Sequence, residues 1–326
     1  MEVKNLTTEF KLKRGIIRAV DDVSFSINKG EILAIVGESG SGKSITSLSI
    51  MGLLQKPGKI AGGDIIFEGQ NLARLSQKEL QKIRGNRISM IFQEPMTSLN
   101  PVHRIQDQIM ETLMIHKQMK KKEALAKTIE LLEMVGIPSA AERAKDYPHQ
   151  MSGGMRQRVM IAMALACDPQ LLIADEPTTA LDVTIQAQIL DLLYHMREKF
   201  HMAVLLITHD LGVVAEAADR VIVMYCGKIV EEAEVKSLFR NPLHPYTKGL
   251  LKSIPQIDDD TDDRLYMIKG MVPDPLNMPS GCSFSDRCDH SFERCTKEMP
   301  ELLEVDGHKV RCHLYASKEG GVGANE

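Results

Sequence analysis

One glycine-rich segment constrains this chain of 326 residues more than any other feature. Residues 37–44 read GESGSGKS and fit the pattern G-x-x-x-x-G-K-[ST]. The segment follows a short apolar run, residues 31–36, and leads into residues 43–54, whose apolar side chains have helical spacing. A strand, a phosphate-binding loop and a helix in this order predict an α/β protein that binds a nucleotide through its phosphates.

Each residue type in this loop has a role in binding phosphate. Glycines let several backbone N–H groups point at one anion, and the N-terminus of the following helix adds positive potential. Lys43 is expected to contact the β- and γ-phosphates, and Ser44 to bind Mg²⁺. The residues predicted to hold the nucleotide are Gly37, Ser39, Gly40, Ser41, Gly42, Lys43 and Ser44.

Two carboxylates follow a second apolar run. Residues 171–174 lead directly into Asp175 and Glu176. In an α/β sheet the end of such a strand lies beside the phosphate loop, so Asp175 is expected to hold Mg²⁺ directly or through water. Glu176 is expected to polarise the attacking water, because phosphoryl transfer requires charge neutralisation and a positioned nucleophile.

A third segment, residues 151–158, has the form of a helix N-terminus. Ser152 can cap this helix, and Gly153 and Gly154 leave backbone amides that can approach a phosphate closely. A chain with its own phosphate loop does not need a second anion site, so we interpret this one as serving a nucleotide held by another subunit. An ordinary capped helix with glycines in its first turn is the alternative.

The rest of the chain divides into regions of different pattern. Residues from about 97 to 158 keep helical periodicity with few strand formers, which predicts an inserted helical subdomain. Strand-like runs at 171–174 and 203–207 alternate with helical stretches, as in a mainly parallel sheet. A break containing two prolines at 241–245 predicts a boundary between a nucleotide-binding domain, residues 1–240, and an irregular extension, residues 241–326.

Charge and hydropathy argue against two classes of protein. The net charge of -4 offers no basic field for a polyanion, so nucleic-acid binding is disfavoured. The longest apolar run, residues 159–167, is much shorter than the roughly 20 residues that span a bilayer. The first residues lack the apolar stretch of a secretory signal, so we expect a cytoplasmic setting.

Four of the six cysteines lie close together near the end of the chain, at Cys282, Cys288, Cys295 and Cys312. Their spacing, C-x5-C-x6-C-x16-C, lacks the C-x2-C pair usual for structural zinc. Four thiolates suit either an iron–sulfur centre or zinc, and spacing alone does not decide between them. The extension has little apolar content, so we expect a bound group to help order it.

The order of these motifs resembles the ATP-binding-cassette family over residues 1–240. Ser152, Gly153 and Gly154, followed by RQR at 156–158, are similar to the family's signature motif, with Met155 where glutamine is more usual. The resemblance implies an α/β fold with a RecA-like phosphate-loop core, an antiparallel β subdomain and the inserted helical subdomain. It also implies ATP and Mg²⁺ as cofactors.

Three further residues carry the same resemblance. Gln93 looks like the Q-loop glutamine, Asp182 ends a segment similar to the D-loop, and His209 looks like the switch histidine. By the resemblance, two such domains, identical or homologous, meet head to tail and enclose ATP between one phosphate loop and the other signature motif. Gln93 is then a catalytic residue and Mg²⁺ ligand, Asp182 lies at the shared nucleotide, and His209 contacts the γ-phosphate.

The adenine contact departs from the family pattern. Family members usually stack the base on an aromatic residue just before the glycine that corresponds to Gly15, but Arg14 stands there. A planar guanidinium can stack on a base, so Arg14 is the predicted adenine contact and Phe10 the alternative.

A narrower resemblance comes from residues 93–101 and 241–247, which look like the ATPase subunits of dipeptide and oligopeptide permeases. It implies an ATP-hydrolysing subunit at the cytoplasmic face of the membrane that powers peptide import with integral permease subunits, a second ATPase subunit and, indirectly, a solute-binding protein. In such subunits the cysteine cluster can hold a 4Fe-4S centre, which favours iron–sulfur over zinc. The alternatives are the ATPase of a nickel importer, a soluble cassette protein, and a scaffold that binds ATP without turnover.

Overall fold

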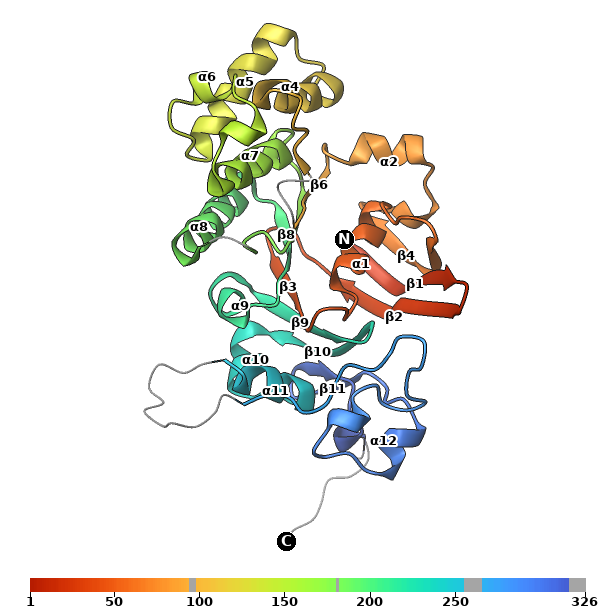
Figure 1. Ribbon diagram of the computed structural model, residues 1–326. Helices are drawn as coiled ribbons and strands as arrows, with labels where there is room; N and C mark the ends of the chain where they lie inside the picture. The colour runs from red at the N-terminus through yellow and green to blue at the C-terminus, as the bar shows by residue number, and fades with distance from the viewer. Residues whose placement is uncertain (94–97, 180–181, 255–265, 317–326) are drawn as a thin grey trace, which may run out of the picture.

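The computed structural model describes residues 1–93, 98–179, 182–254 and 266–316. Within these ranges the strands form two sheets (Figure 1). The larger sheet has the strand order β11-β12-β10-β9-β3-β8-β7-β6, and the smaller has the order β2-β1-β4-β5. The predicted α/β fold class is confirmed by this arrangement and by the structural relatives described below.

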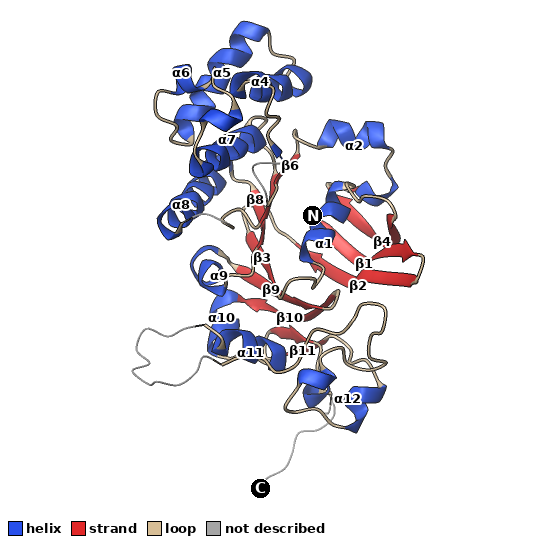
Figure 2. Cartoon of the chain, viewed as in Figure 1, coloured by secondary structure: helices blue, strands red, loops and turns tan. Residues whose placement is uncertain are grey.

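Five parallel strands form one end of the larger sheet, with β6 at its edge. They are β9 (Arg220–Tyr225), β3 (Ile32–Val36), β8 (Ala203–Ile207), β7 (Leu171–Asp175) and β6 (Ile88–Ile91). Every residue of β3, β7 and β8 is buried, because α7 and α8 lie on one side of the sheet and α1 with the smaller sheet lies on the other (Figure 2). Because these strands are parallel, the loops that follow them leave from one edge of the sheet.

Alternate residues of the central strands pack into separate cores. Leu171 and Ile173 join the core with β1 and β2, whereas Leu172 and Ala174 join the core with the helical region. The smaller sheet is formed by β1 (Glu2–Leu12), β2 (Gly15–Ser26), β4 (Gly58–Phe67) and β5 (Gln70–Asn71), with α1 (Lys43–Met51) packed against it. The Thr8 and Ser49 hydroxyls, 2.8 Å apart, join β1 to α1 inside this core.

The predicted helical insertion is helical in the structure. It contains α4 (Ile105–His116), α5 (Lys121–Met134), α6 (Ala140–Arg143) and α7 (Gly153–Leu165). The other α-helices among the described residues are α2 (Gln77–Ile83), α8 (Val183–Phe200), α9 (Leu211–Ala217), α10 (Val235–Arg240), α11 (Pro245–Lys252) and α12 (Glu293–Lys297). Within the described ranges, no helix has the length and apolar character needed to cross a membrane.

The C-terminal extension adds strands to the larger sheet. Strand β12 (His308–Val310) pairs with β10 (Lys228–Glu234), and β11 (Leu303–Val305) pairs with β12. Glu231 of β10 is fully buried and accepts hydrogen bonds from the backbone N–H groups of Leu243 and His244 at 2.8 and 2.9 Å. The His308 ring lies 2.9 Å from the same carboxylate, so one buried acid joins β10, the start of the extension and β12.

Candidate nucleotide site

The phosphate loop follows β3 and ends where α1 begins. Gly37, Gly40 and Gly42 all have positive φ, and Gly40 and Gly42 lie at 80° and 102°. A Cβ on Gly42 would approach the carbonyl oxygen of Ala19 to 2.4 Å, and one on Gly37 would lie 2.2 Å from that of Met224. The loop therefore requires glycine at these positions for backbone conformation and for close packing against neighbouring strands.

Lys43 points back along this loop. Its ammonium group donates to the carbonyl oxygens of Gly37 at 2.7 Å and Glu38 at 3.0 Å, and the side chain is almost wholly buried. Burial lowers the pKa of Lys43, while the carboxylates of Glu176 and Asp175 act in the opposite direction. The arrangement places a buried cation inside the concave face of the loop.

Ser44 and Asp175 bring two oxygens together beside the loop. The Ser44 hydroxyl donates to Asp175 Oδ1 at 3.0 Å, which links the first turn of α1 to the end of β7. Burial raises the pKa of Asp175, and the hydrogen bond from Ser44 partly counters that rise. A hydroxyl and a carboxylate are the hard oxygen ligands that Mg²⁺ prefers.

Glu176 is held by side chains from three other places. Its Oε2 accepts from Gln93 Nε2 at 2.8 Å and from Thr179 Oγ1 at 2.9 Å, and its Oε1 lies 3.4 Å from His209 Nδ1. The backbone of Glu176 is left-handed at φ 47°, a conformation that costs energy for a residue with a side chain. The structure therefore fixes this carboxylate at the edge of the sheet, next to the phosphate loop.

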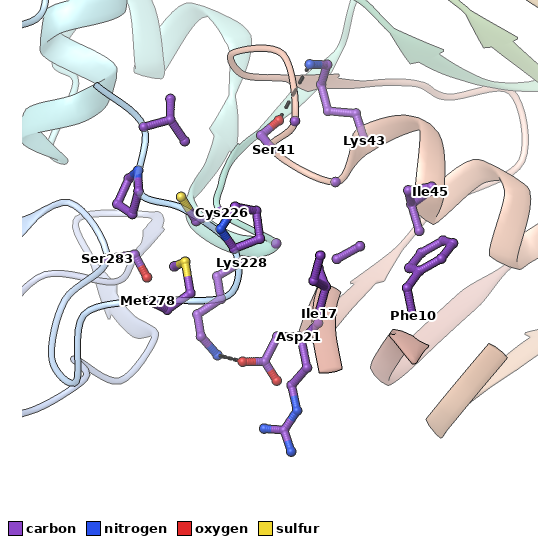
Figure 3. Close-up of a pocket in the computed structure, with 18 of the residues that line it drawn as sticks. Phe10, Ile17, Asp21, Ser41, Lys43, Ile45, Cys226, Lys228, Met278 and Ser283 are labelled. Atoms are coloured by element: carbon purple, nitrogen blue, oxygen red, sulfur yellow. Dashed lines mark hydrogen bonds and ion pairs between the residues drawn. The ribbon is translucent and has the colours of Figure 1, made fainter. Parts of the chain in front are cut away.

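A cavity of about 970 Å³ opens from the phosphate loop. Gln93 and Glu176 line it together with residues 39–45. Figure 3 shows Phe10, Ile17 and Ile45 on one side and Met278 and Ser283 on the other. The cavity thus extends from the phosphate loop between the β1–β2 hairpin and the C-terminal extension, which is enough space for a nucleotide.

Comparison with known proteins shows which families this chain resembles. A family model for "ABC transporter" matches residues 20–179, and a model for "Oligopeptide/dipeptide transporter, C-terminal region" matches residues 230–295. Over 97% of its length the chain is 60% identical to the oligopeptide transport ATP-binding protein AppD of Bacillus subtilis, covering 96% of that protein. The chain belongs to the ABC transporter family.

Other relatives agree with this assignment. The chain is 49% identical to the dipeptide transport ATP-binding protein DppD of Escherichia coli, with 98% of each chain covered. Among solved structures, a dimeric ATP-binding cassette in a post-hydrolysis state with ADP and phosphate matches with a TM-score of 0.65 and 32% identity. The match covers 72% of this chain and 98% of that one. This chain is therefore an ABC ATPase, and the resemblance of its motifs to the family is confirmed.

The residues predicted to form the signature motif do not line the cavity at the phosphate loop. Ser152 caps α7 by accepting from the N–H of Met155 at 3.3 Å, and Asp182 caps α8 by accepting from the N–H of Ile185 at 3.0 Å. A Cβ on Gly154 would lie 3.2 Å from Ile185, so the two helix N-termini are neighbours. Gly153 begins α7. Of the described residues that line the cavity, none comes from this group, and residues 180–181 of the predicted D-loop lie outside the described ranges.

Arg14, the predicted adenine contact, does not line the cavity. It is exposed in the turn between β1 and β2, beyond the described residues that line the cavity. Phe10, the alternative, does line the cavity, together with Leu12 and Ile16. The physical reason is the length of the hairpin, whose turn extends past the cavity, so that strand residues and not the turn residue face the cavity.

The four clustered cysteines of this ABC protein share one small cavity. Cys282, Cys288, Cys295 and Cys312 all line it, and the Cys282 N–H donates to the Cys295 carbonyl at 2.7 Å. Burial raises the pKa of Cys282 and Cys288, and raises that of Cys312 to about 11. Among the described residues, no three His, Cys, Asp or Glu side chains form a group that could hold a metal ion.

Sequence reasoning missed the contact between the extension and the phosphate loop. Arg287 donates to both carboxylate oxygens of Glu38, at 2.7 and 3.0 Å, and the Glu38 N–H donates to the Tyr246 hydroxyl at 2.8 Å. Glu38 stands at a variable position of the loop pattern, and Arg287 belongs to no motif. No signal in the sequence pairs these residues.

Proposed function

We propose that this ABC ATPase powers the import of dipeptides or oligopeptides through a membrane permease. The observation that carries ATP hydrolysis is the geometry around Glu176, which is held by Gln93 and His209 beside the Lys43 loop. The peptide substrate class is supported by the relatives, which are named as oligopeptide and dipeptide transport proteins, and by the match to the C-terminal region of that branch. Neither a nickel importer nor a soluble cassette protein is favoured by these relatives.

The residues of the site have different roles in phosphoryl transfer. Glycines of the loop and Lys43 hold the β- and γ-phosphates, and the buried cation balances their charge. The Ser44 hydroxyl and the Asp175 carboxylate fit Mg²⁺, which would neutralise charge on the same phosphates, with Gln93 as a further ligand. Glu176 orients and polarises the attacking water. His209, which lies beside Glu176, contacts the γ-phosphate.

The separation of Ser152, Gly153 and Gly154 from the cavity supports a shared site. Ser152 and Asp182 cap neighbouring helices, Gly153 and Gly154 lie in the first turn of α7, and the backbone amides there suit a phosphate held by a second subunit. The related cassette solved as a dimer supports the same assembly. Two ATPase subunits, identical or homologous, therefore close head to tail on ATP and separate after hydrolysis, because the γ-phosphate joins them only in the closed state.

For the four clustered cysteines we propose a 4Fe-4S centre, the group that the resemblance to peptide permease subunits favours over zinc. The four thiols line one cavity, as four ligands of one group should. A cubane cluster binds one thiolate at each of its four irons. When bound, the cluster would cross-link the extension.

The partners follow from the proposed transport role. The chain would sit on integral permease subunits at the cytoplasmic face of the membrane, together with the second ATPase, while a solute-binding protein delivers peptide on the other side. ATP-driven closure would then be transmitted to the permease. A general nucleic-acid role is disfavoured by the net charge of -4.

Reconstitution tests the proposed function. The chain should be assembled with its permease subunits and second ATPase in proteoliposomes, and uptake of labelled dipeptides, oligopeptides and Ni²⁺ measured with ATP and with ADP. We expect ATP-dependent peptide uptake and no Ni²⁺ uptake. Accumulation of Ni²⁺ without peptide would assign the nickel alternative, and ATP hydrolysis without uptake of either solute would contradict an import role.

A further inference from the structure

We propose that the C-terminal extension supplies the second face of the adenine site. The base of ATP would lie between the β1–β2 hairpin and residues 272–279, with Leu276 and Met278 as the principal contacts of the extension. This inference rests on the proposed function, because it takes ATP as the nucleotide on the phosphate loop.

Both walls of the cavity present exposed apolar side chains. On the hairpin, Leu12 and Ile16 are 43% and 55% exposed, and on the extension Val272 and Met278 are each 38% exposed. All four line the same cavity, which is continuous with the phosphate loop. Exposed apolar surface is covered favourably by a flat apolar group, and a purine ring joined to phosphates on the loop is such a group.

The extension reaches the hairpin at Leu276. A Cβ on Gly15 would lie 3.2 Å from Leu276 Cδ2, so this side chain closes over the start of β2. Phe10 lies on the hairpin side of the cavity (Figure 3), where its ring can stack on a base. The two walls therefore meet at one end and leave the cavity open toward the phosphate loop.

A rigid turn fixes the position of Leu276. The Asp274 carboxylate accepts from the Leu276 N–H at 3.0 Å and from the Asn277 side-chain amide at 3.0 Å, and the Asn277 N–H donates to the Asp274 carbonyl at 2.8 Å. Prolines at 273, 275 and 279 restrict the backbone on both sides. A preformed wall loses less conformational entropy on binding a base than a mobile one would.

Arg287 joins this wall to the phosphate loop. Its Nε donates to the Lys269 carbonyl at 3.0 Å, while its two terminal nitrogens donate to the Glu38 carboxylate. The segment that leads into residues 272–279 is thus tied to the loop that holds the phosphates. This link sets the distance between the base wall and the phosphate site.

One polar group on the wall has no partner. Ser283 lines the cavity and is 7% exposed as a residue, and its buried hydroxyl oxygen makes no hydrogen bond within the described part of the chain. An unpaired buried hydroxyl costs free energy unless a ligand satisfies it.

Binding of two ligands tests the inference on the full chain. Dissociation constants for MgATP and for Mg²⁺ with inorganic tripolyphosphate should be measured by calorimetry for the wild type and for the double variant Leu276→Ser, Met278→Ser. We expect ATP to bind about tenfold more weakly to the variant, because contacts to the base are lost, and tripolyphosphate to bind equally to both. Met271→Ser is the matched control, since Met271 is 86% exposed and lies outside the cavity lining.

The outcomes separate the two proposals. An unchanged ATP affinity in the double variant, or an equal loss for ATP and tripolyphosphate, would overturn the base wall while leaving the ATPase assignment intact. A wild-type chain that fails to bind ATP would instead contradict the proposed function. Photolabelling of the wild type with 2-azido-ATP needs no variant to fold: labels within residues 272–283 support the inference, and labels confined to residues 10–17 overturn it.

Discussion

The phosphate loop and the C-terminal extension differ in the sequence distance over which their contacts act. Lys43 donates to the carbonyl of Gly37, six residues earlier, and the glycines that shape the loop lie within the same turn. The extension depends on pairs far apart in the chain, such as Arg287 with Glu38, separated by 249 residues, and His308 with Glu231, separated by 77. Short-range hydrogen bonds shape much of the first region, whereas the second is held by long-range polar contacts and by apolar side chains such as Phe284.

This difference predicts which substitutions should change ATP hydrolysis and which should change stability. A change in the loop or beside it should alter chemistry while leaving the fold intact, because the buried strands β3, β7 and β8 support the loop. Loss of a buried acceptor such as Glu231 should loosen the extension, because it leaves backbone N–H groups at the junction unpaired. The following experiments test this contrast, beginning with the largest expected effect.

Glu176→Gln should have the largest effect on ATP turnover and little effect on thermal stability. Replacing the carboxylate with an amide of the same shape removes the group that polarises water, so we expect ATP turnover to fall about 10²- to 10⁴-fold. ATP affinity and thermal stability should stay near the wild-type values. Steady-state phosphate release and calorimetric binding of ATP measure the two effects. Turnover within a few fold of the wild type would contradict the role assigned to Glu176.

Glu231→Ala should destabilise the junction between β10 and the extension. It leaves the buried N–H groups of Leu243 and His244 without their acceptor, so we expect a loss of about 3 kcal/mol in the free energy of unfolding. Chemical denaturation measures this loss. Glu304→Ala, an exposed glutamate on β11, is the control and should change stability by less than about 0.5 kcal/mol. Equal stability of the two variants would contradict the importance of the buried contact.

The same junction should weaken in acid through His244. Burial lowers the pKa of this ring from 6.5 to about 3, and its Nδ1 accepts from the Tyr246 N–H at 3.0 Å. The unfolded chain therefore binds a proton between these two pH values while the folded chain does not, so stability is complete above pH 6.5 and falls as the pH falls. Between pH 7 and pH 5 we expect a loss of about 2 kcal/mol from this group.

His244→Asn provides the comparison for this pH effect. Asparagine keeps an acceptor at the N-cap of α11 but does not titrate, so the variant should lose less stability between pH 7 and pH 5 than the wild type. Denaturation curves at both pH values measure the difference. Parallel losses in the two proteins would show that other groups cause the acid effect.

Arg287→Lys should have the smallest effect of the set. Lysine keeps the charge but cannot donate to both oxygens of Glu38, so we expect ATP to bind roughly fivefold more weakly, with little change in global stability. Arg294→Lys is the control, because Arg294 pairs with Glu298 on an exposed helix face. An ATP affinity equal to that of the control would mean that the extension does not position the loop.

Much of the nucleotide site could be predicted because its motifs describe local chemistry. The loop pattern specifies the glycines and Lys43, and the apolar run before Asp175 places that acid and Glu176 at the edge of a buried sheet. The adenine wall could not be predicted in this way. Arg14 is next to Gly15 in sequence, but the length of the hairpin decides that Phe10 and not Arg14 lines the cavity.

The sequence by itself determined the α/β class, the phosphate loop and the helical insertion, because helix and strand periodicity and the glycine pattern act over a few neighbouring residues. The tertiary structure alone decided that β12 pairs with β10, that Arg287 meets Glu38, and that residues 272–279 face the hairpin across the cavity. These contacts join segments that no local pattern connects, and their energies depend on burial and on bidentate geometry, which exist only once the chain has folded.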